Sequence, residues 1–197
     1  MTGHSLRFWD ASGGDIFIRK IWVVIGALLA CLIASSSFAS SINSTDGTNC
    51  ELVFASRVCL CGQWARADVT REDLSEGTIF EHDKSGTVLG FFPFTFEFDD
   101  LRALQDAQRS VFETIEGEGE QRFVEQRQIV VSGELASALR YNTLNGEFNV
   151  GVIDVVFLRP EFGYRIVLTY SDDDHASMIL TNFYDTVLPS IEKVSSK

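Results

Sequence analysis

The chain has 197 residues, of which 45% are hydrophobic, and a formal net charge of −12 at pH 7. This length favours one domain plus a processing segment, and the apolar content is ample for a packed core, which argues against global disorder. An acidic surface without a basic stripe repels phosphate groups, so nucleic-acid binding and docking through basic residues onto anionic membranes are both disfavoured. The main expected effect of the charge is solubility.

The first 39 residues have the pattern of a targeting segment. Arg19-Lys20 precedes an uninterrupted apolar tract, residues 21–34, and Ser37-Phe38-Ala39 forms a small-x-small cleavage site. This order is typical of a secretory signal peptide, and the tract is short for a spanning helix, which needs about 20 apolar residues. Two alternatives are an uncleaved membrane anchor and a bacterial lipoprotein with lipid on Cys31. All three predict export to the periplasm or the extracellular space.

Three further cysteines follow this segment. In an oxidising compartment we expect a disulfide from Cys50 to either Cys59 or Cys61. A zinc site is disfavoured, because no second cysteine pair or nearby histidine completes four ligands. The sequence therefore predicts a leader with a local disulfide over residues 40–77 and a single domain over residues 78–197.

The predicted domain begins with two strands. Thr78–Glu81 and Thr87–Phe98 have strand character and flank a turn, Asp83-Lys84-Ser85-Gly86. The second strand is rich in phenylalanine, and Pro93 within it indicates an edge position or a bulge. Upstream, Glu51–Val58 is apolar enough for a short strand or a helical turn.

A helix is predicted next. Asp99-Asp100 is a suitable cap for a helix whose apolar residues recur at three- and four-residue steps from Leu101 to Ile115. An acidic patch formed by Glu113, Glu116, Glu118 and Glu120 lies at its end. A solvated loop is favoured there over a binding site for a cation or a basic partner.

The remainder predicts a meander of about four strands and a closing helix. The expected strands are Arg122–Val131, Leu135–Thr143, Phe148–Leu158 and Gly163–Tyr170. Asn145-Gly146 is a strong hairpin signal. The helix follows over residues 176–191, with its apolar residues on one face. Short turns make neighbouring strands antiparallel, so the fold class is α+β, a mostly antiparallel sheet covered by helices.

The turn before the closing helix contains the strongest metal-like pattern. Asp172, Asp174 and His175 offer carboxylate oxygens and an imidazole, which suit a divalent cation. The favoured interpretation is structural, because carboxylates at a helix N-terminus oppose the macrodipole and contribute about 0.3–1 kcal/mol each. No catalytic or cofactor-binding residue is assigned, and no cofactor is expected.

Three segments together resemble the PsbP-like α/β/α sandwich family, which includes DcrB-type lipoproteins. They are Ile129–Ala136, Phe162–Leu168 and Phe183–Ile191. The resemblance covers about residues 78–193 and implies extrinsic stabilisers and binders with mostly non-catalytic roles. Its motifs are structural, so no functional residue is carried over from the family.

The favoured function is therefore an exported, non-enzymatic domain that binds a protein partner or stabilises an assembly. One alternative is a carrier of small apolar ligands on the phenylalanine-rich strand, residues 91–98, although core packing of that strand is favoured. The other is a hydrolase whose triad is assembled across strands, which predicts a pocket where His82 or His175 meets a serine and a carboxylate. Nucleic acid is not expected as a partner, and membrane contact is expected only through an uncleaved N-terminal segment or lipid on Cys31.

Overall fold

The computed structural model describes residues 48–61, 64–67, 77–82, 85–116, 121–145 and 148–194. The predicted targeting segment, with its candidate lipidation site Cys31, lies outside these residues, and its export role stays a prediction. Within the described part of the chain, no helix combines the length and the apolar character that crossing a membrane requires.

The elements fall into strands and helical segments. The strands are β1 (Thr48–Val53), β2 (Ser56–Cys61), β3 (Trp64–Arg66), β4 (Thr78–His82), β5 (Thr87–Pro93), β6 (Gln121–Val131), β7 (Glu134–Asn145), β8 (Phe148–Phe157), β9 (Tyr164–Ser171) and β10 (Glu192–Lys193). The helical segments are α2 (Leu101–Glu116), η2 (Pro160–Phe162), α3 (Ala176–Asn182), η3 (Phe183–Val187) and η4 (Leu188–Ser190).

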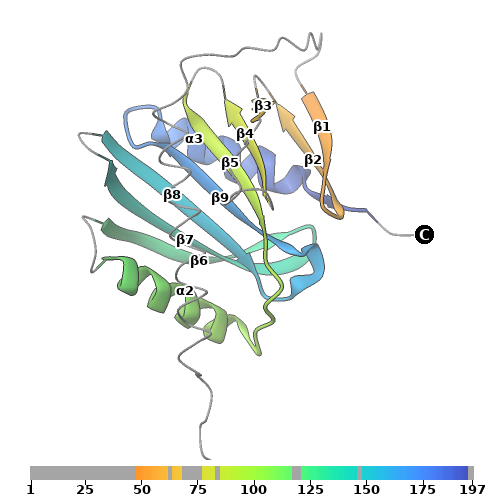
Figure 1. The fold of residues 1–197 in the computed structure, drawn as a ribbon, viewed down its shortest axis with the longest axis vertical. Coiled ribbons are helices and arrows are strands. Elements are labelled where there is room, and N and C mark those ends of the chain that lie inside the picture. Colours follow the sequence, from red (N-terminus) through yellow and green to blue (C-terminus); the bar gives the residue numbers. More distant parts are fainter. Residues whose placement is uncertain are drawn as a thin grey trace, which may run out of the picture.

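The main sheet has the strand order β3-β4-β5-β9-β8-β7-β6, and all its neighbouring strands are antiparallel. The chain leaves β5, passes through α2 to the far edge, and returns by the meander β6 to β9, so that β9 lies beside β5 (Figure 1). A small sheet, β1-β2-β10, lies at one end. The predicted α+β class is confirmed.

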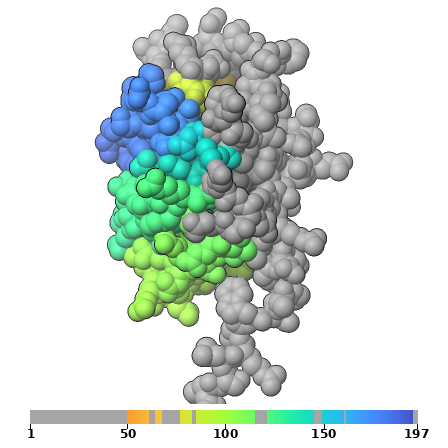
Figure 2. Space-filling view, turned by 90° about the vertical axis from the view of Figure 1, so that its left-hand side faces the viewer, coloured from red at the N-terminus to blue at the C-terminus, as the bar shows by residue number. Residues whose placement is uncertain are grey.

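The two helices cover opposite faces of the main sheet. Figure 2 shows the C-terminal segment in blue and α2 in yellow-green at opposite ends of one side of the molecule, with the strands between them. Residues of β9 alternate between the two layers, as the period of two requires. Ile166 and Leu168 pack in the cluster beneath α3, whereas Val167 packs in the cluster beneath α2.

The N-terminal hairpin extends the core beyond the predicted domain start. Residues assigned to a leader form β1 and β2, and Val53, Val58 and Leu60 are buried in the cluster beneath α3. A disulfide joins Cys50 to Cys59, which are direct partners in the hairpin register. The pairing with Cys61 is therefore not the one that forms.

The predicted edge position of Pro93 is wrong for β5 as a whole, because β5 lies between β4 and β9. Pro93 is the last residue of the strand and pairs only with Tyr164 of β9, since the register of β4 begins at Thr78 opposite Phe91. The N–H that proline lacks would therefore point to a side where no strand pairs with this residue. The predicted strand also ends there, five residues before Phe98.

Candidate functional site

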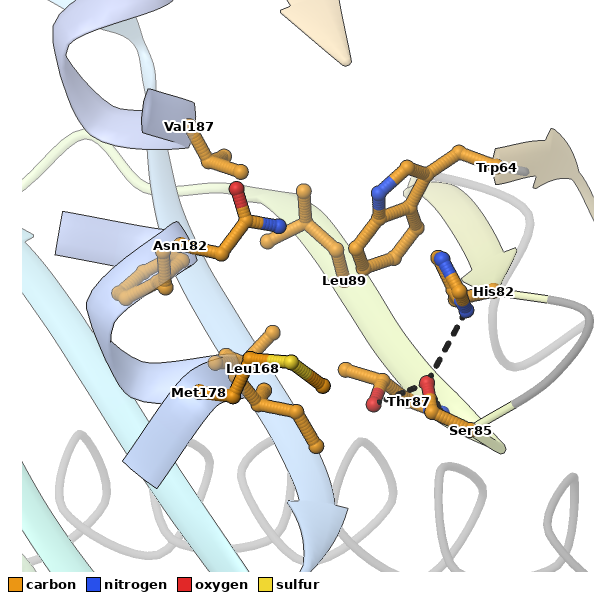
Figure 3. A pocket seen from close by; sticks show the side chains of 11 residues that line it. Trp64, His82, Ser85, Thr87, Leu89, Leu168, Met178, Asn182 and Val187 are labelled. Atoms are coloured by element: carbon orange, nitrogen blue, oxygen red, sulfur yellow. Dashed lines mark hydrogen bonds between the residues drawn. The ribbon is translucent and has the colours of Figure 1, made fainter. Parts of the chain in front are cut away.

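A pocket of about 230 Å³ lies between α3 with η3 and the strands β3, β4, β5 and β9 (Figure 3). Buried apolar side chains contribute Leu89, Leu168, Phe183 and Val187 to its wall, and the remaining lining residues are Trp64, His82, Ser85, Thr87, Met178, Ile179 and Asn182. None of these described lining residues is an Asp, Glu, Lys or Arg. The pocket is consequently apolar, with a few uncharged polar groups.

The sheet register and the helix spacing place these side chains. Leu89 and Leu168 are direct partners on β5 and β9, so both point toward α3. Asn182 follows Met178 by four residues and therefore lies on the same helical face. On the opposite wall, β3 brings Trp64 opposite His82 of β4, and their rings meet edge-on with centroids 5.3 Å apart.

A chain of hydrogen bonds joins His82 to two hydroxyl groups on the same wall. His82 Nδ1 lies 3.1 Å from Ser85 Oγ, and Ser85 Oγ donates to Thr87 Oγ1 at 2.7 Å. His82 Nδ1 accepts the serine proton in one imidazole tautomer and donates its own to the serine oxygen in the other. A general base must accept that proton. The hydrolase alternative therefore finds a histidine beside a serine, but none of the described residues that line the pocket is the Asp or Glu that a triad also requires.

The acidic turn before α3 differs from its predicted capping role. Asp172 Oδ2 accepts hydrogen bonds from the amides of Asn142 at 2.7 Å and Asn149 at 2.9 Å, both across the sheet. Asp173 Oδ1 accepts the backbone N–H of His175, which lowers the pKa of that carboxyl group. His175, the N-cap residue of α3, makes no side-chain capping bond.

The weak metal candidates are Asp172, Asp174 and His175. Asp174 and His175 are exposed, while Asp172 is engaged by two amides. Over the ranges that the structure covers, no group of three or more His, Cys, Asp or Glu side chains is arranged to hold a metal ion. Of the acidic patch after α2, Glu113 pairs with Arg109 at 3.4 Å, and Glu118 and Glu120 lie outside the described residues.

An apolar surface lies on the α2 face at the end of the sheet. Leu135 is the register partner of Val130, and its carbonyl accepts the backbone N–H of Leu158, so these three side chains share one face. Phe98 N–H in turn bonds to the Leu158 carbonyl, and Phe96 lies two residues before Phe98. Val130, Leu135 and Phe96 are 61%, 37% and 58% exposed. We call these five residues the end patch.

A buried ion pair lies beneath α2. Asp154 of β8 and Arg165 of β9 form an ion pair at 3.8 Å, and Gln108 of α2 donates to both the Asp154 backbone carbonyl and its carboxylate. Burial raises the pKa of Asp154, and the Arg165 guanidinium and the Gln108 amide offset part of that rise. Burial likewise raises the pKa of Tyr141, which packs nearby.

Sequence reasoning placed His82 near a serine but missed Trp64 and Asn182. Trp64 is on a three-residue strand and Asn182 is at the end of α3, and no local motif links them. The phenylalanine-rich strand was expected mainly in the core. Phe91 and Phe92 are indeed buried, on opposite faces of the sheet, and Phe94 is buried as well.

Comparison with solved structures gives the fold. The cyanobacterial PsbP protein of Synechocystis superposes with a TM-score of 0.53 over 81% of this chain and 99% of its own, at 12% sequence identity. The Ran-binding protein Mog1p of Saccharomyces cerevisiae gives a TM-score of 0.55 over 77% and 97%, at 9% identity. The chain has the PsbP-like fold. No family model and no curated protein matches the sequence.

The PsbP-like fold agrees with the resemblance seen in the sequence, and at identities of 9–12% it establishes the architecture only. Both structures are covered nearly in full.

Proposed function

We propose that this protein is an exported, non-enzymatic domain that binds a protein partner through the end patch. The observation that carries the proposal is the continuity of this exposed apolar surface across Val130, Leu135 and Leu158, extended by Phe98. Exposed apolar side chains that are contiguous, and not scattered singly, mark interaction sites on soluble proteins.

The rim of the end patch fits such an interface. Arg159, the residue after Leu158, forms an ion pair with Glu97, which lies between the two phenylalanines of the patch. Aromatic residues in the centre with charged residues at the edge are the usual composition of a protein interface. The structural neighbour Mog1p is a Ran-binding protein and provides one example of partner binding on this architecture.

Two features of the chain support export. The N-terminal 39 residues have the order of a secretory signal, and the Cys50–Cys59 disulfide fits an oxidising compartment. A non-enzymatic role is supported by the lack of an Asp or Glu among the described residues that line the pocket beside His82 and Ser85.

A site-specific photo-crosslinker tests the proposed surface in cells of the source organism. Placed at Leu135, it is expected to give a discrete adduct of protein size, whereas the same group at Thr114, an exposed position on α2, gives none. Val130→Asp should abolish the adduct without lowering the unfolding midpoint, because its side chain is already 61% exposed. Equal adducts at Leu135 and Thr114, or none at Leu135, would rule out the end patch as the interface. Protease protection of the intact cells tests export separately.

A further inference from the structure

The pocket beneath α3 contains a buried polar group that has no hydrogen-bond partner among the described residues. Trp64 Nε1 is buried, and no residue in the described ranges accepts its hydrogen bond. Figure 3 shows the amide nitrogen of Asn182 turned toward this indole nitrogen from the helix side of the pocket. A buried donor without an acceptor destabilises the folded state, so each one calls for an explanation.

A ligand oxygen beside the indole N–H would satisfy it, and Asn182 lines the same pocket from the helix side. A carbonyl oxygen accepts from the indole N–H and from the amide N–H. A hydroxyl group also accepts from the indole, and it donates to the Asn182 carbonyl when the amide is rotated by 180°. The hydroxyl groups of Ser85 and Thr87 on the same wall need no hydrogen bond from a ligand, since they already bond to each other.

The other lining residues define the body of a ligand. Leu89, Leu168, Phe183 and Val187 are at most 2% exposed and form an apolar wall. A charged ligand would lose its hydration there with little compensation, because His82 is the one titratable side chain among the described lining residues and none of them is an Asp, Glu, Lys or Arg. The volume of about 230 Å³ lies below the roughly 300–1,000 Å³ of pockets for drug-sized ligands.

The volume also limits the number of atoms. At about 30 Å³ for each water molecule in the liquid, the space corresponds to roughly eight non-hydrogen atoms. A single aromatic ring with one oxygen has this size. Replacing water along the apolar wall by such a ring provides the main driving force for binding.

We propose that this pocket binds a small, uncharged aromatic molecule that carries one hydroxyl or carbonyl oxygen, with the oxygen held between Trp64 and Asn182. Met178, which is 64% exposed at the rim, lies where a ligand would enter from solvent. The long, unbranched side chain of methionine adapts to a ligand with little strain. This binding site is separate from the end patch and does not depend on partner binding there.

Titration of the full-length protein with three probes of similar size tests the proposal. The probes are p-cresol, toluene, which lacks the oxygen, and benzoate, which is charged. The readout is the indole ¹⁵N–¹H signal of Trp64, assigned among the three tryptophans by its loss in Trp64→Phe. We expect p-cresol to shift this signal saturably and to bind at least tenfold more tightly than toluene, with no saturable shift from benzoate.

Variants separate the oxygen contact from the apolar contact. Asn182→Leu should weaken p-cresol at least fivefold and leave toluene unchanged, whereas Gln128→Leu, a matched change of an exposed amide on β6, should alter neither. Ile179→Phe should weaken both by filling the pocket. Equal binding of p-cresol and toluene, tight binding of benzoate, or an unmoved Trp64 signal would each overturn the proposal, the last indicating a pocket that holds water only.

Discussion

The ion pair beneath α2 provides the sharpest test of the structure. Arg165 is 7% exposed, and its guanidinium lies 3.8 Å from Asp154 Oδ1, which accepts no hydrogen bond within the described residues. Arg165→Met keeps the length of the side chain but removes the positive charge that faces the Asp154 carboxylate. Arg102→Met is the matched control, since Arg102 also lies 3.8 Å from its partner Asp106 but is 90% exposed.

The expected losses in the free energy of unfolding follow from the burial of each pair. At an effective dielectric constant of about 20, two unit charges 3.8 Å apart attract by about 4 kcal/mol. Removing one partner of a buried pair typically costs about 3–5 kcal/mol, whereas an exposed pair contributes about 0–1 kcal/mol. We therefore expect Arg165→Met to lower the free energy of unfolding by about 3–5 kcal/mol and Arg102→Met by less than about 1 kcal/mol.

The double variant Asp154→Leu with Arg165→Met removes both charges. Its cost should be well below that of Arg165→Met alone, because replacement of a buried pair by apolar residues is often neutral. Gln108 keeps one acceptor in this variant, the backbone carbonyl of residue 154, to which it donates at 3.1 Å.

The pH dependence of the stability provides a second, independent test. The pKa of Asp154 is raised in the folded protein, so the native state holds this proton more tightly than the unfolded chain does. The cost of the ionised carboxylate is then full above the folded pKa and disappears as the pH falls from the folded pKa toward the unfolded value near 4. The deficit of Arg165→Met, in which the pKa of Asp154 rises further, should accordingly shrink between pH 8 and pH 5.

Urea unfolding followed by circular dichroism measures these differences. Wild type, Arg165→Met, Arg102→Met and the double variant are compared at pH 8 and pH 5. The reasoning is refuted if Arg165→Met and Arg102→Met cost the same, or if the deficit of Arg165→Met grows on acidification. Either result would mean that water reaches the pair.

Three further predictions concern stability. Replacing both Cys50 and Cys59 by serine should lower the free energy of unfolding by about 2.6 kcal/mol in the chain-entropy estimate, since the bridge spans nine positions. Denaturation with and without reductant measures the difference, and equal unfolding midpoints would contradict the prediction. Gly151→Ala should lower the free energy of unfolding by about 1–3 kcal/mol, because a β-carbon there meets the ring of Tyr170. Thermal unfolding should show most of this loss removed in a Tyr170→Leu background, and an unchanged loss would place the strain elsewhere. Asp100→Ala should lower the free energy of unfolding by about 1 kcal/mol, because the Asp100 carboxylate caps α2 through a 2.8 Å hydrogen bond from a backbone N–H. Asp100→Asn should retain most of that stability in the same thermal unfolding experiments, and equal losses in the two variants would argue against the cap.

The sequence predicted the main elements because their patterns are local. Alternation over β9 and the spacing of apolar residues in α2 each reflect a side chain that must face one layer. The cap of α2 was equally readable, since Asp100 bonds to a backbone N–H three residues away. All these signals lie within a single element.

The functional surfaces depended on contacts between distant elements. Asp172 was expected to serve the following helix, yet the amides of Asn142 and Asn149 on β7 and β8 provide its partners. Trp64 and Asn182 are 118 positions apart and meet only through the sheet order. The exposure of Val130 likewise depends on which part of the sheet α2 covers, which residue periodicity does not specify.

The position of β9 between β5 and β8 has a consequence for folding. Val88 and Thr169 are register partners 81 positions apart, whereas the hairpins within the meander close over short turns. As the chain emerges from the N-terminus, β5 has one open edge until β9 is complete, and an exposed edge with apolar side chains favours aggregation. Forming the β5–β9 ladder is therefore expected to be late and slow, since long loops must close before their contacts stabilise the chain. A truncation before residue 164 should leave β5 and β8 each with one unpaired edge, which makes β9 the strand that completes the sheet.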